Sequence, residues 1–145
     1  MKTALTVPAL AVLVLASLLT VACGNDDATT APTTPALPSS EVFSGTVDVQ
    51  GSSFYSFTTA TSGEVSITLA SLVATQPGPA LNTVMSLGVG TPLGTECSVT
   101  NSVPAAPGLT AQLVNTLTPA TYCTRISDVG NLKGPVNFTI RIVHP

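Results

Sequence analysis

The sequence predicts an all-β fold over residues 41–145, an antiparallel β-sandwich or jelly roll of about eight strands. From Glu41 onward apolar residues alternate with polar ones, which is the period of a strand with one buried face. Gly, Pro, Asn and Ser interrupt this alternation at short intervals, as turns do. Charged residues make up only 8% of the chain, and low charge with abundant Thr, Val and Ser favours strands over exposed helices.

The first three strands are predicted over residues 42–50, 54–59 and 64–72, with Gly-containing turns between them. In the second strand, Tyr55 and Phe57 share one face. The third has the clearest alternation. Its inward residues are expected to be Val65, Ile67 and Leu69, and its outward residues Ser66, Thr68 and Ala70.

The next three strands are predicted over residues 81–89, 96–100 and 109–117. Alternate residues from Leu81 to Val89 share one face of the first, and Leu109, Ala111 and Leu113 share one face of the third. The Gly- and Pro-rich stretches 90–94 and 104–108 are expected to break the chain between these strands.

The last two strands are predicted over residues 120–127 and 136–143, joined by a turn region over 128–135. Tyr122, Thr124 and Ile126 are expected to lie together on one face. The inward residues of the last strand are expected to be Val136, Phe138, Ile140 and Ile142.

Residues 1–22 have the composition of an export leader, with Lys2 before a long apolar run that ends at Cys23. The segment Leu19-Thr20-Val21-Ala22-Cys23 resembles the lipobox of bacterial lipoproteins, although the Leu stands one position earlier than usual. This resemblance implies a lipoprotein signal peptide that is removed before Cys23, whose thiol is then acylated. A retained apolar anchor and a plain secreted leader are the alternatives; Pro8 and the marginal length disfavour a membrane span.

Residues 23–40 are interpreted as the acylated Cys23 followed by a Thr/Pro/Ser-rich linker. The linker has no apolar periodicity, so it is expected to stay extended and disordered. It would hold the domain 41–145 off a membrane. The residue after Cys23 is Gly24, not Asp, which by enterobacterial sorting rules permits the outer membrane. The expected location is a membrane-anchored one, at the outer membrane or the periplasm-facing cell envelope.

The chain has three cysteines, an odd number that needs an explanation in an exported protein. Acylation would account for Cys23. Cys97 and Cys123 each lie in a predicted strand of an extracytoplasmic domain, so a disulfide between them is expected, contributing about 3 kcal/mol. The alternative is two separate buried thiols. A zinc site is disfavoured, because neither Cys belongs to a Cys-x-x-Cys pair or has a nearby His.

Three stretches together resemble the bacterial pre-peptidase C-terminal domain, a β-sandwich that is appended to many secreted enzymes. They are residues 53–58 together with 63–69, then 120–128, and 136–142, with the strand sequences Gly-Glu-Val-Ser-Ile-Thr-Leu, Ala-Thr-Tyr-Cys-Thr-Arg-Ile and Asn-Phe-Thr-Ile-Arg-Ile. Ala120 stands where the family often has Gly, and Phe138 replaces its final Tyr. The resemblance implies an auxiliary role, such as binding a substrate or a surface beside a catalytic partner.

Several kinds of chemistry are disfavoured by composition. The part after Cys23 has three Lys and Arg against seven Asp and Glu, so it lacks the basic stripe that nucleic acids require. The only His, His144, is next to the C-terminus, where chains commonly fray, and a catalytic base must be held in place. With no Gly-x-Ser-x-Gly motif either, we expect no enzyme activity and no cofactor.

Two polar features of the predicted domain stand out. Asp128 and Asn131 could ligate a hard cation through oxygen, but residues of this kind more often satisfy a turn. We therefore expect no metal site, with Asp128 and Asn131 as weak candidates. Carbohydrate-binding faces use exposed aromatic rings, and the one aromatic residue predicted to point outward is Phe54.

These observations predict a non-catalytic, lipid-anchored cell-envelope protein with a β-sandwich binding or structural module. The alternative is an accessory module that binds carbohydrate or peptide and assists a separate secreted enzyme. The expected partners are a membrane, through the lipid on Cys23, and a polysaccharide or protein of the envelope. No nucleic acid is expected.

Overall fold

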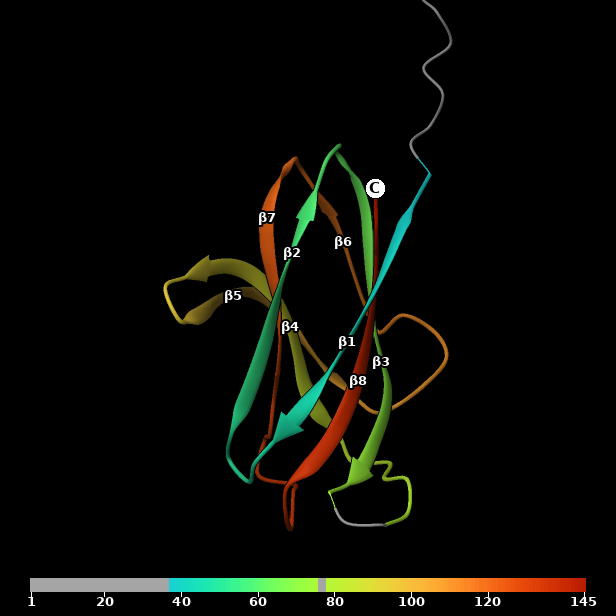
Figure 1. Cartoon of the computed structure of the whole chain (residues 1–145), viewed down its shortest axis with the longest axis vertical. Coiled ribbons are helices and arrows are strands. Elements are labelled where there is room, and N and C mark those ends of the chain that lie inside the picture. Colours follow the sequence, from blue (N-terminus) through green and yellow to red (C-terminus); the bar gives the residue numbers. More distant parts are fainter. Residues whose placement is uncertain (1–36, 76–77) are drawn as a thin grey trace, which may run out of the picture. The chain divides into compact units, whose positions relative to one another are not determined.

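Eight antiparallel strands form two four-stranded sheets that pack face to face (Figure 1). The computed structural model describes residues 37–75 and 78–145. The predicted leader, Cys23 and the linker up to residue 36 lie outside the described residues. The strands are β1 (Ser39–Val47), β2 (Ser52–Thr59), β3 (Gly63–Ala74), β4 (Met85–Leu93), β5 (Glu96–Ala105), β6 (Leu113–Leu117), β7 (Ala120–Ser127) and β8 (Val136–His144). The predicted all-β sandwich is thus confirmed.

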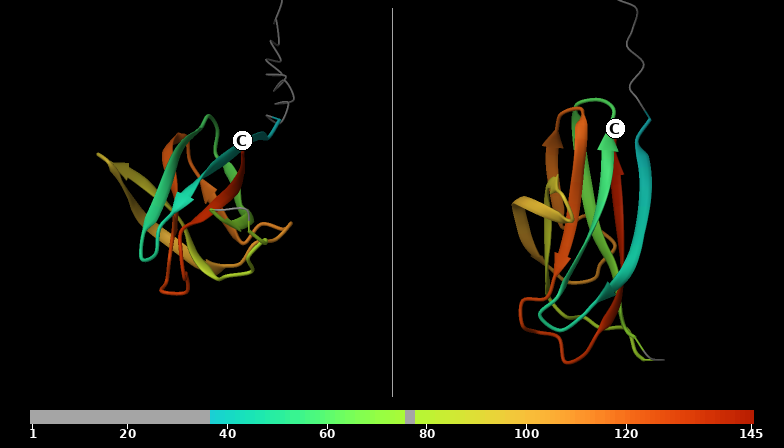
Figure 2. Two further views of the ribbon diagram at one scale, coloured as in Figure 1. Left: turned by 60° about the horizontal axis from the view of Figure 1, so that its bottom comes forward. Right: turned by 60° about the vertical axis from the view of Figure 1, so that its left-hand side comes forward.

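The chain passes repeatedly between the two sheets (Figure 2). Sheet A has the strand order β1-β8-β3-β6, and sheet B has the order β2-β7-β4-β5. Apart from the β4–β5 hairpin, each connection therefore leads from one sheet to the other. In the part of the chain that the structure describes, no helix is long and apolar enough to cross a membrane.

The core lies between the sheets and contains the residues that the alternation predicts. In β3, Val65, Ile67 and Leu69 are at most 1% exposed. The four inward residues of β8 and Ile126 of β7 are equally buried. Because the side-chain period of a strand is two, the polar residues between these positions face outward on both sheets.

The edges β1 and β2 lie beside each other and are joined by aromatic contacts. The rings of Phe43 in β1 and Tyr55 in β2 are stacked with their centroids 4.8 Å apart. Phe43 also meets Phe138 of β8 edge-on at 5.3 Å. On the opposite side of the sandwich, the Asn101 amide of β5 donates to Asn115 of β6. Side chains thus connect the two sheets on both open sides of the sandwich.

The predicted bounds of the two middle strands are wrong. Residues 81–84 precede β4, which begins at Met85 and continues through the predicted break to Leu93. β5 likewise continues through Pro104 to Ala105. Pro104 is tolerated because β5 is the edge of sheet B and pairs only with β4. Gly and Pro, which predicted turns here, lie inside an irregular hairpin.

The predicted strand 109–117 is also too long, because β6 begins only at Leu113. Leu109 is 91% exposed rather than on an inward face. The loop before β6 completes the hydrogen bonding of β3 in another way. The backbone N–H of Gly108 donates to the Leu69 carbonyl oxygen at 2.9 Å, and the Gln112 side chain accepts from the Leu69 N–H at 2.8 Å.

Two predictions about exposure are wrong. Thr68 lies on an outward position of β3 but is only 3% exposed. His144 does not fray: it is 5% exposed, ends β8 and pairs with Ser39. β1 begins at Ser39, two residues before the predicted start of the domain. This pairing explains why the last residues are ordered.

Candidate functional site

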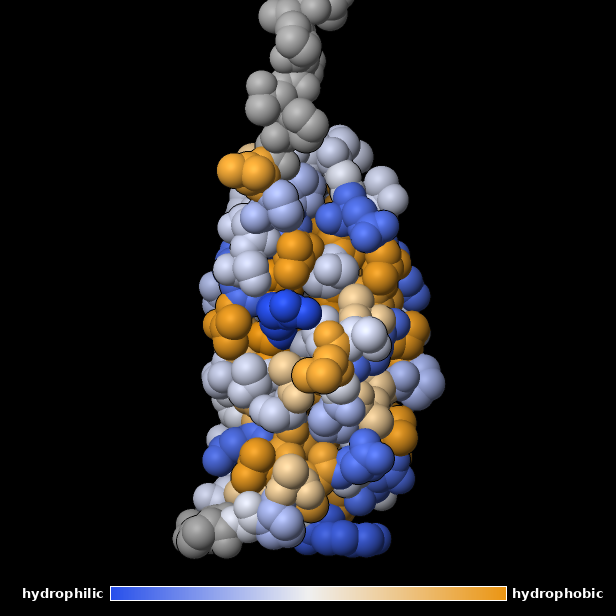
Figure 3. All heavy atoms as spheres, turned by 90° about the vertical axis from the view of Figure 1, so that its right-hand side faces the viewer, coloured by the Kyte–Doolittle hydropathy of each residue, from blue (hydrophilic) through white to orange (hydrophobic). Residues whose placement is uncertain are grey.

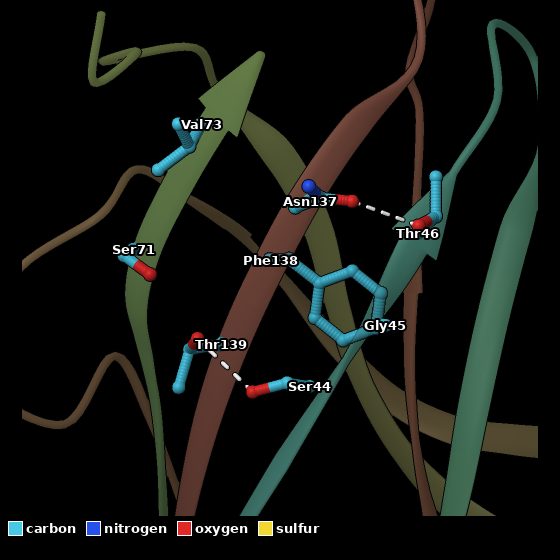
Figure 4. Close-up of a pocket in the computed structure, with 8 residues that line it drawn as sticks. All are labelled: Ser44, Gly45, Thr46, Ser71, Val73, Asn137, Phe138 and Thr139. Atoms are coloured by element: carbon cyan, nitrogen blue, oxygen red, sulfur yellow. Dashed lines mark hydrogen bonds between the residues drawn. The ribbon is translucent and has the colours of Figure 1, made fainter. Parts of the chain in front are cut away.

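The outer face of sheet A has a shallow groove of about 360 Å³ over β1, β8 and β3 (Figure 4). It is lined by Ser44, Gly45, Thr46, Ser71, Val73, Asn137, Phe138 and Thr139. Its polar side chains pair with one another across β1 and β8. The Ser44 and Thr139 hydroxyls are 3.1 Å apart, and the Thr46 hydroxyl donates to the Asn137 side-chain oxygen at 2.8 Å.

This sheet A groove offers little for a ligand. None of its lining residues is charged, and its one ring, Phe138, is 1% exposed. The surface around β3 and β8 has apolar residues scattered among polar ones (Figure 3). A surface whose hydroxyls already satisfy each other gains little by exchanging those bonds for bonds to a ligand.

Sheet B has a different outer face, because the β4–β5 hairpin bends away from the plane of the sheet (Figure 1). The ladder between β4 and β5 has a register shift at Val89 and Gly90. A Cβ at Gly90 would collide with the carbonyl oxygen of Ser98, and one at Gly88 would lie 2.7 Å from Val99 Cγ1. The two glycines therefore permit the bend, since β5 passes close over them.

The predicted disulfide between Cys97 and Cys123 is confirmed, and it holds the bent hairpin against sheet B. The two Cα atoms are 5.9 Å apart. Cys123 lies on an outward position of β7, directly opposite Gly90 of β4, yet it is 0% exposed because the hairpin covers it. The bridge thus joins β5 to the middle of the sheet, two strands away.

The corner between the hairpin and sheet B forms a second groove of about 360 Å³, here called the hairpin groove. It is lined by Ser52, Phe54, Thr95, Glu96, Cys97 and Arg125. Phe54 of β2 and Arg125 of β7 are directly opposite each other in the strand pair and form the floor. Both are half-buried on outward positions, as predicted for Phe54. Thr95 and Glu96 are exposed on the hairpin.

The charges of the hairpin groove are not neutralised by neighbours. Among residues 37–75 and 78–145, neither the Arg125 guanidinium nor the Glu96 carboxylate has a side-chain hydrogen bond or an ion pair. The contact between a basic and an acidic side chain that these residues contain lies elsewhere, between His144 Nε2 and Glu41 at 2.9 Å. The hairpin groove therefore presents one cation, one anion and one ring that are all open to a ligand.

A separate polar network lies between the sheets at the β1–β2 side. Glu41 of β1 accepts a hydrogen bond from the Tyr55 hydroxyl at 2.8 Å, and its other oxygen is 2.9 Å from His144 Nε2. The hydrogen bond from Tyr55 is the main cause of the lowered pKa of Glu41, and the same bond raises the pKa of Tyr55. The other hydrogen-bond partner of His144 is the Pro145 carbonyl. This network ties β1 to β2 and β8.

In the loop with Asp128 and Asn131, the Asp128 carboxylate stabilises a turn. The Asp128 carboxylate accepts from the backbone N–H groups of Gln50, Gly130, Asn131 and Leu132, at 2.9–3.2 Å. These bonds, that from Gln50 foremost, lower the pKa of Asp128. The Asn131 amide donates to the Val84 carbonyl. Within the described ranges, no three His, Cys, Asp or Glu side chains cluster as metal ligands would.

Comparison with known proteins adds no relative. No protein-family model matches the chain, and no curated protein matches it. The resemblance to the pre-peptidase C-terminal domain therefore stays a prediction.

The sequence identified only part of the hairpin groove. Phe54 and the two cysteines were singled out, and the structure brings them together. Arg125 and Glu96 were missed, because they are 29 positions apart in the chain and meet only through the bent hairpin. The glycines of β4 at every second position, Gly88 and Gly90, were the available signal, since two bare outward positions in one strand indicate close approach of another segment.

Proposed function

We propose that this chain is a non-catalytic lipoprotein of the cell envelope, whose β-sandwich is a binding module that Cys23 holds at a membrane. The leader and the Cys23 segment support the anchor. The hairpin groove supports binding, and it is the observation that carries the proposal. It offers a cation, an anion and a ring on two strand-built walls that a disulfide joins. Walls that are already rigid lose little freedom when a ligand binds.

The placement of the imidazole supports a non-catalytic role. A hydroxyl nucleophile needs a base within hydrogen-bond reach. The hairpin groove has the hydroxyls of Ser52 and Thr95, but the one His of the chain lies between the sheets beside Glu41. Within the described part, no hydroxyl or thiol is hydrogen-bonded to His144. A structural task for this imidazole fits these contacts better than catalysis.

The accessory role is a second candidate, in which the module binds carbohydrate or peptide and assists a separate secreted enzyme. The side-by-side placement of Phe54 and Arg125 favours it, since a ring and a guanidinium together are common in ligand sites. The resemblance to the pre-peptidase C-terminal domain agrees with such a role.

Labelling with palmitate tests the anchor. Full-length protein expressed in a bacterium with labelled palmitate should become labelled and sediment with membranes, and Cys23→Ala should abolish both. Cys97→Ser serves as the control and should leave labelling intact, because the Cys97 thiol is committed to the disulfide. Labelling that survives Cys23→Ala would contradict the anchor.

A further inference from the structure

We propose that the hairpin groove binds a hexuronate unit of an acidic polysaccharide, with its carboxylate on Arg125 and its ring face on Phe54. This inference rests on the proposed function of the same groove as a binding site, and it names the ligand class. The observation that supports this inference is the floor of the hairpin groove. Phe54 and Arg125 are direct neighbours across the β2–β7 pair, on outward positions, and both are half-buried.

The guanidinium and the ring fit the two sides of a hexuronate. Arg presents a planar fork of N–H donors that matches a carboxylate in a bidentate manner. Within residues 37–75 and 78–145 the Arg125 guanidinium has no ion pair and no side-chain hydrogen bond, so this capacity is free for a ligand. An aromatic ring next to it offers an apolar surface for the C–H face of a pyranose. A ligand with one carboxylate on a C–H-rich ring engages both.

Glu96 on the opposite wall further restricts the class of ligand that the groove can bind. An ionised carboxylate only accepts hydrogen bonds, so the ligand has to bring donors to that side. Sugar hydroxyls are such donors, and the hydroxyls of Ser52 and Thr95 add further polar contacts along the rim. A phosphate monoester carries a higher negative charge than a carboxylate, so Glu96 repels it more strongly. The pair of Arg125 and Glu96 thus favours a carboxylate that is surrounded by hydroxyls.

The geometry of the walls also favours a saccharide over an extended peptide. Peptides that add a strand need a free sheet edge. The free edge of the floor strand β2 lies on its side away from β7, and β7 pairs with β2 on one side and with β4 on the other, so the floor between these strands has no open strand edge. It therefore offers side chains rather than open backbone groups. Its volume of about 360 Å³ lies at the small end of the range for ligand pockets, which suits a ring-sized group.

Calorimetry on the full-length protein in detergent micelles tests this inference with three probes. Two are acidic oligosaccharides of different linkage and epimer, trigalacturonate and a hyaluronan tetrasaccharide. The third is methyl-esterified trigalacturonate, which keeps the rings and hydroxyls but lacks the charges. We expect at least one acidic probe to bind, and we expect trigalacturonate to bind at least about ten-fold more tightly than its ester, since a charge-assisted bidentate pair is lost.

Variants assign the binding to the hairpin groove. Arg125→Gln should weaken binding of the acidic probe about ten-fold or more, and Phe54→Ala should weaken it several-fold. Arg125→Lys should give an intermediate loss, because it keeps the charge but not the fork. Arg141→Gln removes an exposed Arg from sheet A and is the matched control, with no change in affinity expected. Unchanged thermal unfolding would show that each variant is folded.

The outcomes separate this inference from the proposed function. Absence of binding to both acidic probes overturns it, and so does an affinity that neither the ester nor Arg125→Gln lowers. Binding of the ester that is as tight as that of trigalacturonate and depends on Phe54 overturns the acidic ligand and leaves a binding module for neutral sugars. Palmitate labelling at Cys23 is measured independently, so a failure of the sugar experiment leaves the anchor standing and a failure of labelling leaves the sugar site standing.

Discussion

The outer faces of the two sheets have grooves of equal volume, yet their chemistry differs. On sheet A, the regular pair of β1 and β8 places hydroxyls and amides directly opposite each other, and these groups pair: Ser44 with Thr139, and Thr46 with Asn137. On sheet B, the bent β4–β5 hairpin makes a second wall, which separates Arg125 on the floor from Glu96 on the hairpin. A regular strand pair satisfies its own side chains, whereas an irregular one leaves polar groups free for a ligand.

Two features of the sequence make this difference. Gly88 and Gly90 remove side chains from the outer face of β4, so that β5 can pass close over it. Cys123 lies opposite Gly90 and forms the disulfide with Cys97. Sheet A has neither glycines that open its outer face to another segment nor a disulfide among its described strands. The hairpin groove is therefore expected to depend on the glycines and the bridge together.

Removing the bridge should have the largest effect. The double substitution Cys97→Ala with Cys123→Ala should lower the free energy of unfolding by about 3 kcal/mol, because the unfolded chain is no longer cross-linked. It should also abolish the affinity of the hairpin groove, since one wall is released. Urea unfolding and calorimetry measure the two effects. Wild-type affinity in the double variant would mean that the bridge stabilises the domain without shaping the site.

Adding a side chain to the glycine-lined outer face of β4 should have a smaller but clear effect on stability. Gly90→Ala should cost about 1–3 kcal/mol of unfolding free energy, because its Cβ meets the backbone of Ser98 and the hairpin has to shift. Gly134→Ala is the matched control: its Cβ would have no heavy atom within 4 Å, so its cost should stay within about 0.5 kcal/mol. Equal costs in urea unfolding would show that the close approach of β5 is not needed.

Breaking the hydroxyl pair on sheet A should have the smallest effect. Ser44→Ala removes an exposed hydrogen bond to Thr139 and should cost about 0.5–1 kcal/mol, with no change in the affinity for acidic oligosaccharides. The same urea and calorimetric measurements apply. A loss of affinity in this variant would show that the binding site lies on sheet A and not in the hairpin groove.

The repeating parts of the fold were accessible from the sequence. Alternation of period two identified the inward residues of β3, β7 and β8, because each of these strands has one face on the core. The bridge between Cys97 and Cys123 also followed from the odd number of cysteines, once residues 1–22 are interpreted as an export leader and Cys23 as acylated. The local sequence pattern is enough to predict burial where alternate residues of a strand face the core and the others face solvent.

The irregular parts were not accessible, for reasons that lie outside any local window. The residues Gly90 and Pro92 predicted a break, but they stand inside β4, where the backbone of β5 passes close over Gly90. The position of His144 near the chain end predicted fraying, but Glu41, more than a hundred residues away, holds it in the sandwich. The placement of Arg125 and Glu96 in one groove depends on the same bend.

Mapping of the bound oligosaccharide by nuclear magnetic resonance tests most directly whether sheet B carries the binding face. Amide chemical shifts of the full-length protein in micelles would be followed during addition of trigalacturonate. We expect the changes in shift to concentrate around Ser52, Phe54, Thr95, Glu96 and Arg125, and the shifts of Ser44, Thr46, Asn137 and Thr139 to stay unchanged. Changes that concentrate on the second set, or that spread equally over both sheets, would contradict this expectation.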